Sequence, residues 1–157
     1  MAAVMSGGCA CGDIRYECTD APIVELICHC RDCQRASGAA SAAIMFVAAD
    51  RFSFLKGEPN HYEITGGSGR QIRRCFCGKC GSPVTAYWPV APNLQLIQVS
   101  SLDDPSIFKP TKELWLSRAH DWHAMHPNTE KTDGAPTGIR DMVAAYFAKR
   151  AEAPPRS

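Results

Sequence analysis

The 157-residue sequence lacks a large excess of charge of either sign and has no long apolar run. Its 17 lysines and arginines nearly balance its 16 aspartates and glutamates, so no summed field would draw it to nucleic acid or an anionic membrane. No segment approaches the roughly 20 apolar residues that span a bilayer, and residues 1–8 do not resemble a secretory signal. We therefore expect a cytoplasmic protein with a small-molecule partner, and neither nucleic acid nor a membrane as partner.

Cysteine, by contrast, is abundant, with nine residues in the chain. A reducing cytosol does not favour a disulfide framework, and an odd number leaves one thiol unpaired in any complete pairing scheme. An isolated thiol such as Cys18 fits the role of a small buried hydrophobe. Three tight clusters do not fit that role, and they indicate metal ligation.

Two of the clusters can combine into one closed site. Cys9-x-Cys11 and Cys77-x-x-Cys80 each offer two thiols from a short turn, and glycines flank both pairs where the backbone must bend tightly. Together they supply the four ligands of a tetrahedral zinc ion. Such a site would contribute folding stability, because it leaves no coordination position for a substrate.

The third cluster, Cys28-x-Cys30-x-x-Cys33, offers three thiolates from six residues. Three protein ligands plus one free position are typical of catalytic zinc. Two alternatives stay open: His29 or Cys75 could be a fourth ligand that closes the site, or the thiols could form a redox set. If the segment is extended, His29 points away from its neighbours, whereas Cys75 would share a strand face with Cys77.

Three further histidines, His120, His123 and His126, recur every third residue near the end of the expected domain. Turn-forming residues surround them, so we favour solvated or locally hydrogen-bonded side chains over a metal site.

Most of the chain is predicted to form short strands. The clearest candidate is 13–18, where strict alternation places Ile14, Tyr16 and Cys18 on one buried face. Regular spacing of strands and turns favours a mainly β, mainly antiparallel fold. The other strand candidates are 23–27, 43–47, 71–76, 84–88, 94–99 and 112–116.

The composition changes after Trp122, which predicts a zinc domain over 1–124 and a linker with a C-terminal helix over 125–157. Ile139, Met142, Val143, Tyr146 and Phe147 form one stripe of an amphipathic helix. That stripe could pack on the sheet domain or on a second copy of the protein, as in a homo-oligomer.

The cysteine motifs carry a family resemblance over roughly residues 5–122. The sequence resembles the glutathione-dependent formaldehyde-activating enzyme family, also called the centromere-protein-V type domain. The matching segments are Gly8-Cys9-x-Cys11-Gly12-x-Ile14-x-Tyr16, Cys28-His29-Cys30-x-x-Cys33-x-Arg35-x-Ser37-Gly38-Ala39, Phe76-Cys77-x-x-Cys80-Gly81-Ser82-Pro83 and Leu102-Asp103-Asp104-Pro105, with Phe108, Pro110, Trp115 and Trp122.

This resemblance implies an Mss4-like zinc-bound β-sheet fold with two zinc ions per chain. It implies structural zinc on Cys9, Cys11, Cys77 and Cys80, and catalytic zinc on Cys28, Cys30 and Cys33. The implied activity is that of a carbon–sulfur lyase that joins formaldehyde to glutathione, resembling S-(hydroxymethyl)glutathione synthase.

Two features depart from the family pattern: Glu113 stands where many relatives carry histidine, and Cys75 is an additional thiol. Both features concern substrate recognition, because members of a family share their fold and metal sites more reliably than their substrate. Arg35 has the chemistry of a carboxylate partner, although an exposed arginine needs no such role. The alternative function is a non-enzymatic, zinc-stabilised Mss4-like binding module.

Overall fold

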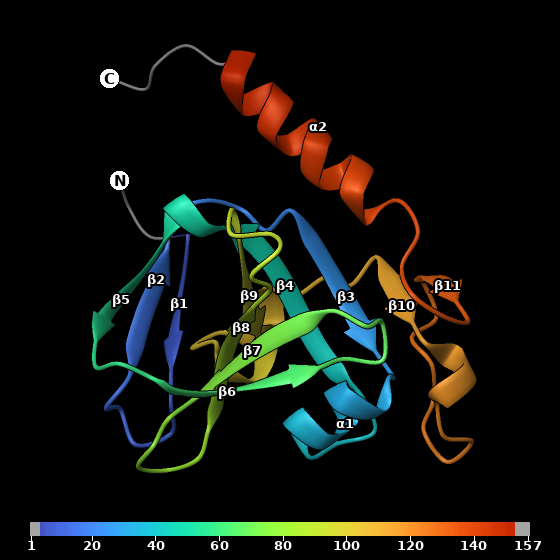
Figure 1. Ribbon diagram of the computed structural model, residues 1–157, viewed down its shortest axis with the longest axis horizontal. Coiled ribbons are helices and arrows are strands. Elements are labelled where there is room, and N and C mark those ends of the chain that lie inside the picture. The colour runs from blue at the N-terminus through green and yellow to red at the C-terminus, as the bar shows by residue number, and fades with distance from the viewer. Residues whose placement is uncertain (1–3, 153–157) are drawn as a thin grey trace.

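The computed structural model describes residues 4–152, which fold into two β-sheets and two α-helices (Figure 1). The helices are α1 (Arg31–Ser37) and α2 (Ile139–Glu152), and 3₁₀ turns occupy Ala49–Arg51, Val99–Ser101, Pro105–Ile107 and Leu116–Arg118. The strands are β1 (Met5–Gly8), β2 (Arg15–Cys18), β3 (Val24–Cys28), β4 (Ala42–Ala48), β5 (Phe52–Lys56), β6 (Asn60–Thr65), β7 (Gln71–Phe76), β8 (Pro83–Tyr87), β9 (Leu94–Gln98), β10 (Lys112–Leu114) and β11 (Glu130–Thr132).

The small sheet has the antiparallel order β1-β2-β5, and the large sheet has the order β11-β10-β3-β4-β9-β8-β7-β6. Antiparallel pairs connect β3 through β6 in the large sheet, as the regular spacing of turns predicts. At the other edge β10 pairs in parallel with both β3 and β11. This parallel edge was not predicted, because short strands carry no signal for the direction of a distant partner.

The core lies on both faces of the large sheet. Alternate residues of β4 point to opposite faces, so Met45 and Val47 join one apolar cluster while Ile44 and Phe46 join the other. The first cluster also contains Ile14, Tyr16 and Cys18, the predicted inner face of β2, and it joins the small sheet to the large one. The second cluster contains Cys28 and Cys33, so the predicted reactive segment is built into the core.

Each of the seven predicted strand segments overlaps an observed strand, and the mainly β fold is confirmed. The sequence analysis missed β1, β5, β6, β11 and α1. Four of five residues in β5 and five of six in β6 are exposed, so neither strand shows apolar alternation. The helix α1 has only two buried residues, Cys33 and Gln34, and it is too short for a 3.6-residue stripe to show.

The predicted C-terminal helix is α2, and its apolar stripe faces the sheet domain. Ile139 is buried in the second core cluster, and Met142 and Val143 pack against that cluster. Hydrogen bonds then fix the second half of the helix: the Tyr146 hydroxyl donates to Asp20 at 2.7 Å. Figure 1 shows α1 and α2 at opposite ends of the molecule. No helix within residues 4–152 is long and apolar enough to cross a membrane.

The segment that joins β10 to α2 is more ordered than the linker expected there, because it contains β11. The side chain of the buried Lys112 donates to Glu130 at 2.6 Å across this parallel pair. The predicted division into 1–124 and 125–157 stays a prediction.

Candidate metal centres

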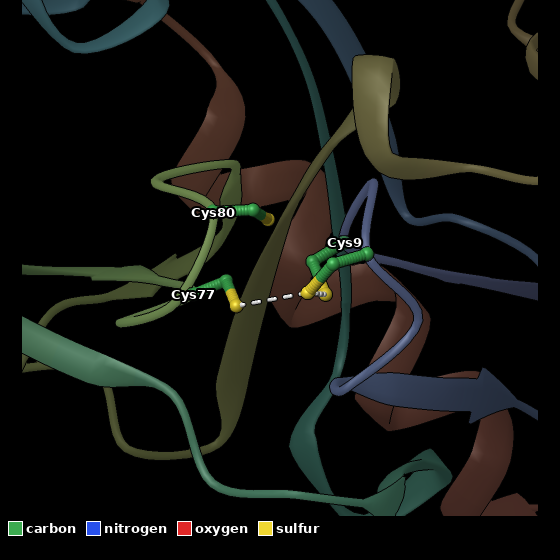
Figure 2. Close-up of side chains that lie close together, drawn as sticks. Cys9, Cys77 and Cys80 are labelled. Atoms are coloured by element: carbon green, nitrogen blue, oxygen red, sulfur yellow. Dashed lines mark hydrogen bonds between the residues drawn. The ribbon is translucent and has the colours of Figure 1, made fainter.

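Two loops bring Cys9, Cys11, Cys77 and Cys80 together, and we call these residues the four-sulfur group. Cys9 and Cys11 lie between β1 and β2, and Cys77 and Cys80 lie between β7 and β8. Figure 2 shows side chains from the two loops directed toward a common space. All four sulfur atoms lie within 4.8 Å of one another. The sequence thus predicted correctly which cysteines would meet.

The two loops have the tight backbone that the glycines predicted. Gly12 and Gly81 adopt φ angles of +75° and +77°, a region that residues with a side chain seldom enter. The Gly81 amide donates to the Cys77 carbonyl at 2.8 Å, which closes the turn between the two ligands. In the other loop the Ile14 amide donates to Cys9 Sγ at 3.2 Å. An amide aimed at a sulfur favours its thiolate form.

The spacing of the sulfurs suits a tetrahedral ion. Cys9 Sγ lies 3.5 Å from Cys11 Sγ, which lies 3.7 Å from Cys77 Sγ. Four sulfurs around a zinc ion at its usual bond length are about 3.8 Å apart. The Ser82 side chain and backbone lower the pKa of Cys80 to about 5, which favours the ligating thiolate at neutral pH. The group could therefore hold a metal ion.

The second group, Cys28, Cys30 and Cys33, is called the three-sulfur group, and its sulfurs also lie within 4.8 Å of one another. Cys28 ends β3, Cys30 is the N-cap of α1, and Cys33 lies in the first turn of that helix. The Cys33 amide donates to Cys30 Sγ at 3.3 Å, so one ligand side chain also begins the helix. Cys28 and Cys33 are buried, whereas Cys30 is partly exposed.

The three thiols cannot all ionise unaided. Hydrogen bonds from the neighbouring Cys28 and Cys33 thiols, together with hydrogen bonds from backbone amides, lower the pKa of Cys30 to about 2. The same contact with Cys30 raises the pKa of Cys28 far above its ordinary value, because a second negative charge beside the first is unfavourable. A divalent cation removes this conflict, so the donor set and its burial suit a zinc ion better than three free thiols.

Neither proposed fourth ligand joins the three-sulfur group. His29 points into the protein, where its Nε2 lies 2.8 Å from Glu113 Oε1 and both side chains are buried. Cys75 is buried in β7 and belongs to neither group, and burial raises the pKa of its thiol. Within residues 4–152, no histidine, cysteine, aspartate or glutamate supplies a fourth donor atom to this group.

Glu113, which we identified as a departure from the family pattern, is the centre of a buried polar network behind the three-sulfur group. It accepts hydrogen bonds from the His126 amide at 3.2 Å and from the Thr129 hydroxyl at 2.9 Å. Burial raises its pKa, but the hydrogen bonds from His29, Thr129 and His126 outweigh that effect and leave the pKa below its ordinary value. Its charge and acceptors hold the segment after β10 against the loop that carries Cys28 and Cys30.

Gln34 fixes the same loop from the other side. Its amide nitrogen donates to the His29 carbonyl at 2.7 Å and to the Arg118 carbonyl at 3.0 Å. Its carbonyl oxygen lies 3.2 Å from His120 Nε2, which places that histidine in a local hydrogen bond. His126 Nδ1 accepts from the Asn128 amide at 3.2 Å, and His123 lies beside the His29 ring. None of the three histidines joins a metal group among the described residues.

Arg74 also contacts the three-sulfur group, and the sequence analysis did not identify it. Its Nη2 lies 3.7 Å from Cys33 Sγ, and the residue is 6% exposed. A positive charge at this position favours thiolate on Cys33. One sequence signal was available: Arg74 interrupts the apolar face of a predicted strand, where a buried charge needs a partner.

Comparisons with known proteins relate the chain to one family and to one solved structure. The model of the family "Glutathione-dependent formaldehyde-activating enzyme" matches residues 4–118. No curated protein matches the chain. A crystal structure of a Rhodobacter sphaeroides protein, solved as a structural genomics target, aligns with a TM-score of 0.50 and 20% identity, covering 63% of this chain and 88% of the other. At that identity the likeness concerns the fold alone.

Proposed function

Because the chain belongs to the glutathione-dependent formaldehyde-activating enzyme family, we propose that it is a zinc-dependent carbon–sulfur lyase acting on a thiol and a small aldehyde. The observation that carries this proposal is the three-sulfur group, which offers three buried or partly buried ligands and no fourth within residues 4–152. Three protein ligands are typical of catalytic zinc sites. Glutathione and formaldehyde are the substrates that the family name suggests.

The two cysteine groups have different roles in this proposal. Cys9, Cys11, Cys77 and Cys80 hold a structural zinc ion, and Cys28, Cys30 and Cys33 hold a catalytic one. When bound, the catalytic ion supplies Lewis acidity, which favours the thiolate form of a substrate thiol or polarises an aldehyde oxygen. None of the nine cysteines, all of which lie within residues 4–152, is in a disulfide, which agrees with a reducing compartment such as the cytoplasm.

The reaction joins the two substrates without any oxidant or reductant. The substrate sulfur forms a bond to the aldehyde carbon, and the carbonyl π electrons move to oxygen. The proton lost by the thiol ends on that oxygen, giving a hydroxymethyl thioether. The reverse reaction breaks the same carbon–sulfur bond, so the enzyme is a lyase in that direction.

The side chains around the three-sulfur group contribute to the reaction by holding the cysteine loop in position and by balancing its charge. Gln34 and the His29–Glu113 pair hold the loop that carries Cys28 and Cys30 from two sides. The Arg74 guanidinium beside Cys33 offsets part of the negative charge of the three thiolates. Burial of Cys28 and Cys33 excludes water from the inner side of the group, which strengthens each of these electrostatic effects.

The decisive experiment is a direct assay of adduct formation from formaldehyde and glutathione, measured above the uncatalysed rate. Zinc-loaded protein is expected to accelerate the reaction in both directions, and Cys30→Ser is expected to remove the acceleration while circular dichroism stays unchanged. Cys18→Ser is the matched control, because that buried thiol belongs to neither metal group. Equal rates with wild type and Cys30→Ser would contradict the proposal and favour a zinc-stabilised binding module.

A further inference from the structure

A cavity of about 360 Å³ is lined by residues of α1, β6, β7, β8 and β9 and by Gly81 in the loop before β8. Arg74 belongs to its lining and also contacts Cys33 Sγ, so the cavity adjoins the proposed reaction centre. Arg35, one turn along α1 from Arg31, lines it as well and is exposed to solvent. This volume lies in the range of small-molecule sites.

The lining is positively charged, and one of its buried N–H donors has no partner among the described residues. Among the described residues that line the cavity, two are arginines and none is aspartate or glutamate. Neither Arg35 nor Arg74 has an ion pair with a carboxylate within residues 4–152. Arg74 is 94% buried, and its Nε has no hydrogen-bond partner among the described residues.

A buried guanidinium with an unpaired N–H group is unfavourable unless another molecule supplies an acceptor. Among the described residues, Cys33 contacts only one nitrogen of this guanidinium, Nη2. A carboxylate suits the remaining need, because two parallel N–H donors of arginine match its two oxygens. Gln98 adds a neutral polar residue to the lining.

We infer that this cavity binds a carboxylate of the thiol substrate, so that Arg35 and Arg74 select anionic thiols for the neighbouring three-sulfur group. The inference rests on the proposed function for the identity of the substrate. It narrows that substrate to a thiol with a carboxylate, and it gives Arg35 the role of a specificity residue at the cavity mouth. A neutral thiol would leave the arginine donors without an acceptor.

Binding can be tested separately from turnover with S-methylglutathione, which retains both carboxylates and has no free thiol. Calorimetric titration of the zinc-loaded protein is expected to show binding that weakens about tenfold in Arg35→Gln, the size of one charge-assisted hydrogen bond. Arg140→Gln, at an exposed position on α2, is the matched control and should bind as wild type does. The diethyl ester of the probe should bind at least tenfold more weakly than the acid. Equal binding of acid and ester would overturn the inference.

Turnover provides the second arm, with 3-mercaptopropionate and 3-mercapto-1-propanol as thiols of similar size. The ratio of their kcat/KM values with formaldehyde is expected to favour the acid by about tenfold, and Arg35→Gln should bring it close to one. A ratio of one in the wild type would overturn the inference while leaving the proposed function intact. Binding of S-methylglutathione without turnover of glutathione or of either small thiol would support the cavity assignment and contradict the proposed function. Arg35→Lys should restore part of the preference, because it keeps the charge but not the bidentate geometry.

Discussion

The two cysteine groups are built from opposite kinds of connection. The four-sulfur group joins segments 66 residues apart, as the contact of Cys11 with Cys77 shows, and two of its members are exposed. The three-sulfur group comes from a single six-residue segment and is supported from behind by Glu113, Gln34 and Arg74. The first group can hold distant parts of the fold together, whereas the second is held in place by the fold. The same ligand chemistry can thus serve stability in one place and reactivity in another.

The largest effect is expected from breaking the four-sulfur group. Cys77→Ser removes a buried ligand, so the metal-dependent link between the two loops should be lost with on the order of 5 kcal/mol of unfolding free energy. Chemical denaturation and zinc content measure this effect. Cys18→Ser is the control, because Cys18 is equally buried but outside both groups. A Cys77→Ser protein as stable as this control would contradict the stabilising role of the four-sulfur group.

Breaking the three-sulfur group should affect reactivity far more than stability. Cys30→Ser is expected to lose one zinc ion per chain and all activity above background, yet to melt within about 4 °C of the wild type. The polar network behind the loop remains, so the loop should keep its shape. Zinc analysis, the formaldehyde assay and thermal melting measure these three quantities. Unfolding of this variant would show that the second group is structural as well.

The supporting network should have an intermediate effect. Glu113→Gln keeps the side-chain shape but replaces one accepting oxygen with an NH₂ group, which cannot accept the hydrogen bonds that the carboxylate receives. We therefore expect the free energy of unfolding to fall by about 1–3 kcal/mol. Hydrogen exchange at the His126 amide should become faster. Glu63→Gln is the control, because solvent screens the exposed Glu63–Arg73 pair and its loss should change stability little. Equal stability of the two variants would contradict a supporting role for Glu113.

The smallest effect is expected at Ser82, whose hydroxyl accepts from the Ala10 amide at 3.1 Å and contacts Cys80 Sγ at 3.2 Å. Ser82→Ala should lower the melting temperature by about 2–4 °C. It should also raise the pKa of Cys80, because Ser82 is the main cause that lowers it to about 5. Protons would then compete better for the sulfur, so zinc release on acidification should begin at a higher pH. Zinc release at the wild-type pH would contradict this account.

The sequence was sufficient for the features that depend on local pattern. Alternation predicted the inner face of β2, and cysteine spacing predicted both sulfur groups. Helical periodicity of apolar residues predicted the stripe that begins at Ile139. The missed features depend on distant contacts. Glu113 meets His29 across 84 residues, and Arg74 meets Cys33 across 41, so neither pairing leaves a periodic signal. The exposed strands β5 and β6 lack apolar alternation because they have little to bury.

One property of the cavity affects how future variants should be interpreted. Gly81, from the loop that carries Cys77 and Cys80, and Pro83, the first residue of β8, line the cavity together with Arg35. A change that disturbs the four-sulfur group would therefore move one wall of the cavity before the domain unfolds. A substitution in that loop would raise KM and imitate the loss of a ligand contact. Zinc content measured beside each KM would distinguish a residue that touches the substrate from one that keeps the wall in place.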